Sequence, residues 1–343
     1  QEVPIENCFA GFDAYQKVID ADVDIILDAT PPYFRPKHVA AAVQAKKHIF
    51  AEKPVAVDPV GVRSIMASAE KAKSMDLCIV PGTHYRHQRD KAAAWHQVAQ
   101  GAIGEIVGGN IYFMTGKLWH RDLNPAWTEM EYMIRDWVNW CWLSGDHIVE
   151  QHVHNIDLMN WFTGSHPVKA SGFGSRLRRV TGDQYDNFSV DFVFENGMHF
   201  HSMCRQINGC FNNVSDRIQG TKGSTDCTGT IVDLAGNEIW KYEYPPDKDG
   251  NPGQSVSVEP HLQEQITFVT SIRTGKIINE IEKTAIATLV AIMGRVSAYT
   301  GKEVTYEEML NSDMQLGPKS LAFGPVDIPK ELPVPGLAYL PQV

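Results

Sequence analysis

The stretch DIILDATPPYFRPKHVAAAVQAKKHIFAEKP, residues 24–54, decides the fold because it predicts a strand, a helix and a second strand in succession. The apolar run at residues 24–29 ends at a Thr-Pro-Pro tripeptide, a pattern typical of a buried strand followed by a loop. An alanine-rich segment with lysines in its last turn follows at residues 36–47, and the next apolar run stops before Pro54. A helix between two strands forms a βαβ unit, so we predict parallel pairing.

The same alternation continues along the chain. Asp58 and Pro59 predict a helix start, because an aspartate side chain caps free N–H groups and proline suits the first helical turn. Apolar side chains then recur at helical spacing, and residues 77–82 predict a third strand. We therefore expect residues 1–103 to form the later part of an open parallel sheet in an α/β fold.

Residues 104–343 follow a different pattern and predict a second domain. The clearest element is NFSVDFVFENGMHFHSMC, residues 187–204, in which apolar and polar side chains alternate. Asn196-Gly197 divides this segment with a two-residue turn that needs positive φ. We expect an antiparallel hairpin with one buried face.

The C-terminal part predicts helices and then an extended arm. Segments 264–276 and 279–301 have helical character, with an Asn279 to Glu282 capping arrangement and a helix stop at Gly301. The proline-rich end, residues 318–341, predicts an arm that lies on another surface.

Composition excludes several classes of function. The chain has 31 Lys plus Arg against 41 Asp plus Glu, a net charge of -10, which argues against a nucleic-acid partner. We find no apolar run long enough to span a bilayer, so no membrane partner is expected. The six cysteines form no CxxC pair and predict buried thiols. The compartment stays open between the cytoplasm and a bacterial periplasm.

Two loops follow predicted strands and are candidates for ligand contacts. In open α/β sheets, ligands bind beyond the carboxyl ends of the strands. One loop contains Thr30, Pro31 and Pro32, and the other contains Glu52 and Lys53. A lysine held by a following proline at the end of a buried strand is well placed to meet a ligand.

The segment GDHIVEQHVHNID, residues 145–157, concentrates histidines and carboxylates. If it is one helix, Glu150 and His154 are four residues apart and lie on one face, with His147 one turn earlier. A metal site is geometrically possible, but the segment matches no zinc motif such as HExxH, and we predict no metal. A catalytic role for His154 is favoured over packing alone.

Taken together, the motifs resemble the glucose-fructose oxidoreductase and inositol dehydrogenase family (Gfo/Idh/MocA). They are EKP at 52–54, GAIGEI at 101–106, the segment 145–157 followed by WFTG and PVKA, and AIMGRVSAYTGKEVTYEEML at 291–310. The resemblance implies the C-terminal part of a dinucleotide-binding Rossmann domain, a doubly wound parallel sheet, over residues 1–103. Residues 104–343 would form an α/β substrate-binding and oligomerisation domain with a large open, mainly antiparallel sheet.

The resemblance also implies an activity and its residues. The family's members are NAD- or NADP-dependent oxidoreductases that act on sugars, polyols and their derivatives. Lys53 matches the family's active-site lysine, and the usual Asp-x-x-x-His motif falls on Glu150 and His154, with Glu in place of Asp. Oxidising an alcohol needs a base at the hydroxyl, which suits His154, and a cation that stabilises developing alkoxide charge, which suits Lys53.

Further residues are candidates for substrate contacts, because the family often places such contacts in the segments GTHYRH (82–87) and KLWHRD (117–122). They are Tyr85, Arg86, Trp119 and Arg121. His152, in the segment 145–157, is a further candidate, with structural packing as the alternative. The carbohydrate substrate and the reacting carbon stay open, and a homodimer or homotetramer is expected by resemblance.

A dinucleotide fold usually carries G-x-G-x-x-G after its first strand, and the sequence has no such motif in that context. We expect roughly sixty or more upstream residues in a longer protein, about two βα units. The choice between NAD and NADP and the phosphate-binding residues are therefore left open. Two alternatives remain, an NAD-retaining glycoside hydrolase that works by oxidation, elimination and reduction, and a non-catalytic sugar-binding protein without cofactor.

Overall fold

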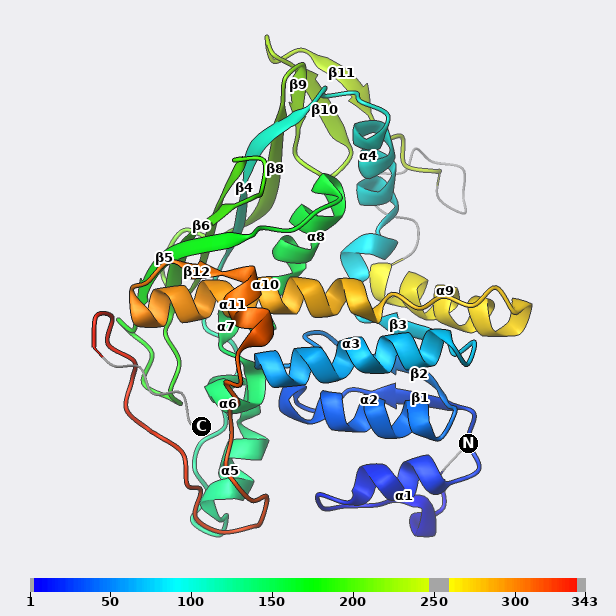
Figure 1. Cartoon of the computed structure of the whole chain (residues 1–343), viewed down its shortest axis with the longest axis vertical. Coiled ribbons are helices and arrows are strands. Elements are labelled where there is room, and N and C mark those ends of the chain that lie inside the picture. The colour runs from blue at the N-terminus through cyan, green and yellow to red at the C-terminus, as the bar shows by residue number, and fades with distance from the viewer. Residues whose placement is uncertain (1–2, 247–258, 338–343) are drawn as a thin grey trace.

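The structure is a computed structural model that describes residues 3–246 and 259–337 (Figure 1). Its first sheet is parallel, with the strand order β1-β2-β3. The strands are β1 (Ile25–Asp28), β2 (His48–Ala51) and β3 (Ile79–Pro81). The accompanying helices are η1 (Ile5–Asn7), α1 (Ala14–Asp20), η2 (Pro32–Phe34), α2 (Arg35–Gln44), α3 (Pro59–Lys73), η3 (His84–His87) and α4 (Arg89–Ala99).

These elements confirm the βαβ units predicted from the sequence. The side chain of Asp58 accepts a hydrogen bond from the Gly61 N–H, and Pro59 occupies the first turn of α3, as expected for this pair. β2 is buried along most of its length, with α2 packed against it. The loops that follow β1, β2 and β3 therefore open at the same edge of this sheet.

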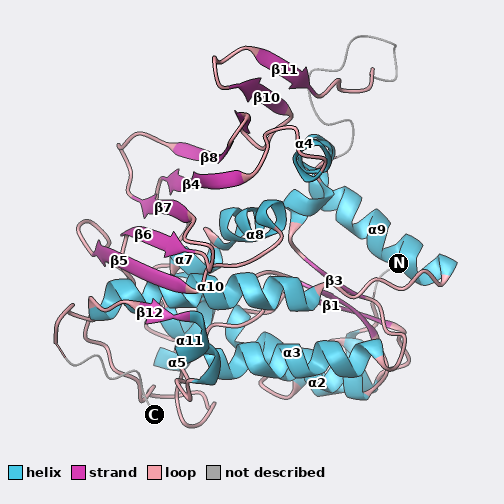
Figure 2. Cartoon of the chain, turned by 45° about the horizontal axis from the view of Figure 1, so that its top comes forward, coloured by secondary structure: helices cyan, strands magenta, loops and turns pink. Residues whose placement is uncertain are grey.

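The second sheet has nine strands in the order β11-β10-β9-β8-β4-β7-β6-β5-β12 (Figure 2). Its pairs are antiparallel except β4 with β7, so the predicted α/β fold with a large, mainly antiparallel sheet is confirmed. The strands are β4 (Ile106–Thr115), β5 (Lys169–Ser175), β6 (Asn187–Val193), β7 (His199–Gln206), β8 (Asn213–Gly220), β9 (Gly223–Thr225), β10 (Thr230–Asp233), β11 (Glu238–Lys241) and β12 (Val304–Thr305).

The predicted hairpin is β6 and β7, with Phe188, Val190 and Phe192 buried on the inner face. The helices of this part are α5 (Glu129–Arg135), η4 (Trp137–Asn139), α6 (Cys141–Ser144), α7 (His147–Glu150), α8 (Val153–Thr163), α9 (Pro260–Thr274), α10 (Ile281–Thr300) and α11 (Tyr306–Asn311). α10 joins the two sheets, because it packs against β5, α7 and α8 as well as α3. Gly294 permits this close packing, since a Cβ there would lie 3.1 Å from Phe192 Cζ.

Two local expectations are wrong. Residues 145–157 do not form one helix: the chain breaks at Gln151 and His152 into α7 and α8. Asn279 does not cap α10 either, because its Nδ2 donates to Ala69 O at 2.9 Å and Glu280 occupies the N-cap without a side-chain bond. Tertiary hydrogen bonding outweighs the local signal in the second case.

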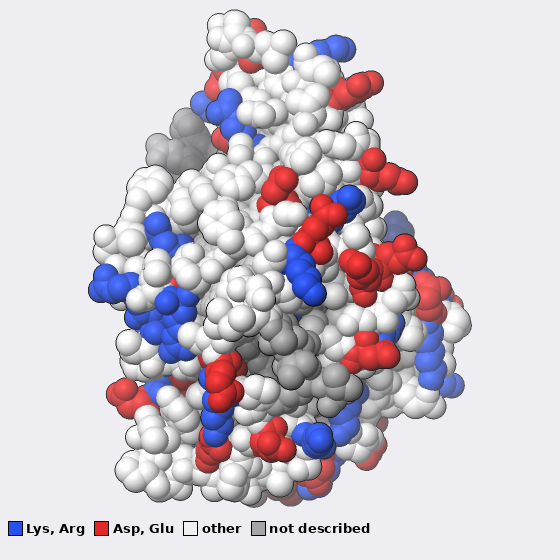
Figure 3. Space-filling view, turned by 60° about the vertical axis from the view of Figure 1, so that its left-hand side comes forward, with Lys and Arg blue, Asp and Glu red and all other residues white. Residues whose placement is uncertain are grey.

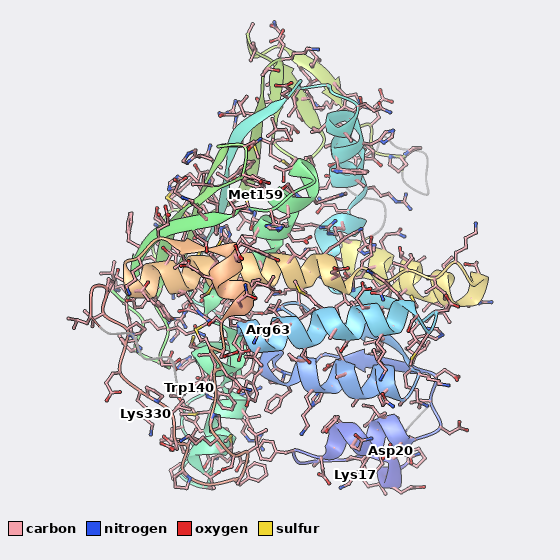
Figure 4. All side chains as sticks on the ribbon, in the orientation of Figure 1. Lys17, Asp20, Arg63, Trp140, Met159 and Lys330 are labelled. Carbon is pink, nitrogen blue, oxygen red and sulfur yellow. The ribbon has the colours of Figure 1, made fainter. Side chains whose placement is uncertain are left out.

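The end of the chain runs over other surfaces, as expected for an arm, although residues 338–343 lie outside the described residues. Arg63 on α3 donates to Leu310 O at 2.7 Å and Ser312 O at 2.6 Å, just after α11 (Figure 4). Farther on, Lys330 pairs with Glu129 of α5 at 2.5 Å. The boundary between the domains at residues 103 and 104 stays a prediction, because α9 returns to pack against β3.

Candidate active site

Lys53 and Glu150 meet where the loop after β2 faces the end of α7. Lys53 Nζ lies 3.1 Å from Glu150 Oε1 and also donates to the Glu150 carbonyl oxygen. Their side chains are only 10% and 8% exposed. Reduced solvent screening strengthens such a pair, so Glu150 fixes the position of the lysine cation. The peptide bond between Lys53 and Pro54 is cis.

His154 is in the first turn of α8, near enough to Lys53 for the lysine charge to affect its pKa. Its side chain is buried, and within the described residues its Nδ1 has no hydrogen-bond partner. Burial, and then the positive charge of Lys53, hold the pKa of His154 well below its usual range. The imidazole is therefore uncharged near neutral pH and available to accept a proton.

Asp146 holds the start of α7 and thereby the position of Glu150. It has positive φ (71°), and its side chain accepts a hydrogen bond from the His147 N–H at 2.5 Å. The other carboxylate oxygen accepts from the Tyr185 N–H at 3.0 Å and from the Tyr299 hydroxyl. Because these partners belong to α7, the start of β6 and α10, Asp146 ties three elements together beneath the site.

Two histidines that the sequence did not single out complete the cluster around His154. The ring of His84 in η3 meets His154 edge-on, with centroids 4.6 Å apart. The ring of His261, at the start of α9, stacks on His84 at 4.2 Å. Burial, and then His261 and Lys53, lower the pKa of His84 to about 3. The GTHYRH segment, which forms η3, was expected to hold substrate contacts. No sequence pattern links this segment with α9.

Tyr85 is also near His154, with ring centroids 5.3 Å apart. Lys91 Nζ lies over the Tyr85 ring, 4.6 Å from its centroid, and 4.0 Å from Asp216 Oδ2. Asn155 Nδ2 donates to Asp216 Oδ1 at 2.7 Å, so this polar network supports the site from the side of the large sheet. The predicted substrate contact of Tyr85 agrees with this placement and stays a prediction.

The other candidate substrate residues lie elsewhere. Arg86 forms a bidentate ion pair with Asp157, in which Nε donates to Oδ2 at 2.8 Å and Nη2 donates to Oδ1 at 2.9 Å. His152 is fully buried, and its Nε2 lies 2.7 Å from Ser202 Oγ, which argues for packing rather than substrate contact. Trp119 meets the Trp137 ring at 6.1 Å, and the N–H of Arg121 donates to Asp136, so both belong to a group around α5 and η4.

Thr30 and Pro31, two of the predicted cofactor-binding residues, line a cavity of about 530 Å³ beside β1. This volume is within the range of small-molecule sites. The wall is mainly apolar, including Phe34, and carries a polar group in which Thr30 Oγ1 donates to Asp28 Oδ1 at 2.6 Å. Such a wall fits a flat ring with polar substituents. Pro32, Glu52 and Lys53 do not line this cavity.

Glu52 is directed toward the loop after β3. A Cβ at Gly82 would lie 2.5 Å from Glu52 Oε2, so a larger residue there would require this carboxylate to move. Glu52 Oε2 also accepts a hydrogen bond from the Lys53 N–H at 3.2 Å. The loops after β2 and β3 are thus packed together beside the Lys53 pair.

Within residues 3–246 and 259–337, no group of three or more His, Cys, Asp or Glu side chains is arranged to hold a metal ion. Nor is any helix in these ranges both long and apolar enough to cross a membrane.

A sheet of parallel βαβ units beside a second domain with a large open sheet is the architecture of two-domain Rossmann-fold proteins. Residues 2–80 match the family model "Oxidoreductase family, NAD-binding Rossmann fold", and residues 92–226 match "GFO/IDH/MocA C-terminal domain". The chain belongs to the Gfo/Idh/MocA family, as the sequence motifs predicted. The NAD-binding description of the first model agrees with the predicted nicotinamide cofactor.

Relatives and solved structures agree with this assignment. The scyllo-inositol 2-dehydrogenase (NAD(+)) of Bacillus subtilis is 22% identical over 79% of this chain and 75% of its own. The myo-inositol 2-dehydrogenase of Thermotoga maritima is 24% identical over 48% of this chain. The chain spans about half the length of several curated relatives that it matches, with 43%, 57% and 44% covered in three of them.

Solved structures show the same fold. A levoglucosan dehydrogenase in complex with NADH and levoglucosan has a TM-score of 0.67 at 20% identity, covering 85% of this chain and 82% of its own. An oxidoreductase domain protein from Kribbella flavida has a TM-score of 0.70 at 19% identity, covering 85% and 83%. At these identities the likeness establishes the fold.

Proposed function

We propose that the protein is an NAD- or NADP-dependent oxidoreductase that transfers a hydride between the nicotinamide ring and a CH–OH carbon of a sugar or polyol. The observation that carries this proposal is the buried pair of Lys53 with Glu150 beside the uncharged His154. An acid/base and a fixed cation in one low-dielectric cleft are what alcohol oxidation requires. Family membership and the names of the inositol dehydrogenase relatives support the substrate class.

In the direction of alcohol oxidation, His154, Lys53 and Glu150 have separate roles. His154 accepts the proton that leaves the substrate hydroxyl, because its imidazole is uncharged near neutral pH. Lys53 stabilises the negative charge that develops on the same oxygen. Glu150 holds the Lys53 ammonium in place through the contact at 3.1 Å. In the reverse direction, the protonated imidazole returns its proton to the carbonyl oxygen.

A bound nicotinamide cofactor would supply the hydride acceptor. Thr30 and Pro31 would contact it through the apolar wall beside β1, and the loop at Glu52 and Lys53 would face it near the substrate.

A hydrolytic or hydrating reaction that retains its cofactor is the second candidate. Two relatives, from Escherichia coli and Mediterraneibacter gnavus, are named 2,7-anhydro-N-acetylneuraminate hydratase. In such a cycle the substrate carbon is oxidised, a neighbouring bond breaks by elimination, and the carbon is reduced again. Reduced nicotinamide would then not accumulate.

The test is a panel of sugars, polyols and glycosides with NAD⁺ and with NADP⁺, following both nicotinamide reduction and bond cleavage. Accumulation of reduced nicotinamide supports the dehydrogenase, and cleavage without accumulation supports the second candidate. Sugar binding that needs no nucleotide and is unchanged by Lys53→Met contradicts both and favours a non-catalytic sugar-binding protein.

A further inference from the structure

The buried position of His154 raises the question of how its proton reaches solvent. The side chain is 8% exposed, and in the part of the chain that the structure describes its Nδ1 has no hydrogen-bond partner. An acid/base that works repeatedly must exchange a proton with water in each cycle, so this buried ring needs a route to solvent.

A continuous line of imidazoles leads away from His154. His84 meets His154 edge-on, at 4.6 Å between centroids and 68° between planes. The His261 ring stacks on the His84 ring, with centroids 4.2 Å apart and 26° between the ring planes. The His261 side chain is 60% exposed, and its Nδ1 lies 2.5 Å from Glu259 Oε1. The line therefore begins at a buried ring and ends at an exposed ring with a carboxylate.

We propose that His84 and His261 form a proton relay between His154 and solvent. This inference rests on the proposed function. When the substrate alcohol is oxidised, its carbon gives a hydride to the nicotinamide and its hydroxyl gives a proton to His154. That proton passes through one water to His84, through a second water to His261, and then to water beside Glu259. All three rings end the cycle in their starting protonation states.

The charges around His84 favour passage over storage. Glu264 is buried, and the charges of Glu52 and Glu259 act on its carboxyl. The cations Lys53 and Lys91 and the ring of Tyr85 face the inner part of the relay, and Glu259 stands at its exposed end beside His261. Burial and these cations disfavour the charged form of His84, as expected of a transient carrier. The hydrogen bond from His261 lowers the pKa of Glu259, so this carboxylate stays ionised beside the exposed end of the relay.

The direct test measures the ring N–H of His154 by nuclear magnetic resonance in the full chain labelled with ¹⁵N-histidine. The relay predicts that His261→Phe and His84→Phe each slow the exchange of this N–H with water by about tenfold or more. His199→Phe is the matched control, because His199 is as exposed as His261 and also pairs with a carboxylate, Asp191. His154→Gln assigns the signal.

Unchanged exchange in both relay variants would overturn the proposal. His84→Gln, which keeps a polar side chain, serves as a second variant if the phenylalanine does not fold. Because this readout needs no turnover, it separates the relay from the proposed activity. If the wild-type chain turns over a sugar, added imidazole should restore activity to His261→Ala but not to Lys53→Met. If the wild type turns over no sugar but N–H exchange is slowed in both relay variants, only the proposed function is contradicted.

Discussion

Lys53 is the single side chain on which the chemistry depends most. Replacing it with methionine keeps the length of the side chain but removes the cation that stabilises charge on the substrate oxygen. We expect turnover to fall by about 10²–10³-fold, the range seen when one such stabilising group is removed. Steady-state kinetics measures this, with Lys302→Met as the control, because Lys302 is exposed after α10. Equal losses in the two variants would contradict the role of Lys53.

Buried neutral histidines make stability depend on pH. Burial lowers the pKa of His152 to about 3, below the model-peptide value of 6.5. The stability that uncharged His152 contributes to the folded state is therefore fully present above about pH 6.5. It is lost as the pH falls toward the folded pKa, because only the unfolded state binds the proton. The free energy of unfolding should drop by about 1.4 kcal/mol per pH unit more in the wild type than in His152→Gln. Urea unfolding at several pH values measures the difference, and parallel curves would contradict it.

Sequence motifs predicted two residues of the candidate site, Lys53 and His154. Lys53 and His154 lie together because the EKP and the histidine segments are local patterns with a fixed place in the fold. His84 and His261 could not be paired from the sequence, since 177 residues, 261 minus 84, separate them and only the packing of α9 on η3 brings them together. The role of His152 depends on a contact with Ser202 that has no local signal.

Among the elements, the break at Gln151 and His152 puts Glu150 on α7 and His154 on a separate helix, α8. A continuous helical pattern was expected there, and the sequence did predict the strands and helices of the parallel sheet, whose apolar periodicity is strong. The start of α7 is held by Asp146, which is fully buried and bonded to other elements. Local propensity carries no information about such long-range partners.

Asp146→Ala should therefore loosen α7. The change leaves the Tyr185 N–H and the Tyr299 hydroxyl without the carboxylate that accepts their hydrogen bonds, and it keeps a positive φ that alanine disfavours. We expect a loss of about 3 kcal/mol in the free energy of unfolding. Chemical denaturation measures it, with exposed Asp122→Ala as the control. A loss no larger than that of the control would show that other contacts hold α7.

The whole molecule presents the outer face of the large sheet to solvent. Figure 3 turns the corresponding side forward, and charged residues of both signs are scattered there among broad uncharged areas. The strand register places Phe173, Ser189, Met203 and Tyr112 in one row across this face, and Phe173 is 71% exposed. Three large, mainly apolar side chains in one row favour the predicted homodimer or homotetramer contact at this face.

Introducing charge on this row should dissociate the assembly. We expect Phe173→Asp combined with Met203→Asp to yield monomers, because burying two carboxylates against a second apolar face costs several kcal/mol. Sedimentation velocity measures the mass in solution. Leu234→Asp is the control, since Leu234 is 75% exposed at the tip between β10 and β11. An unchanged mass in the double variant would place the contact elsewhere.

The most direct test of the proposed hydride transfer, and of the role of Lys53 in it, follows nicotinamide absorbance. The wild type and Lys53→Met are compared with NAD⁺ or NADP⁺ and a panel of polyols and sugars. Binding of the same compounds is measured by calorimetry. We predict that at least one compound yields reduced nicotinamide with the wild type, and that Lys53→Met binds it but forms the product about 10²–10³-fold more slowly. Sugar binding of equal strength by both proteins, with no reduced nicotinamide from any compound, would contradict it.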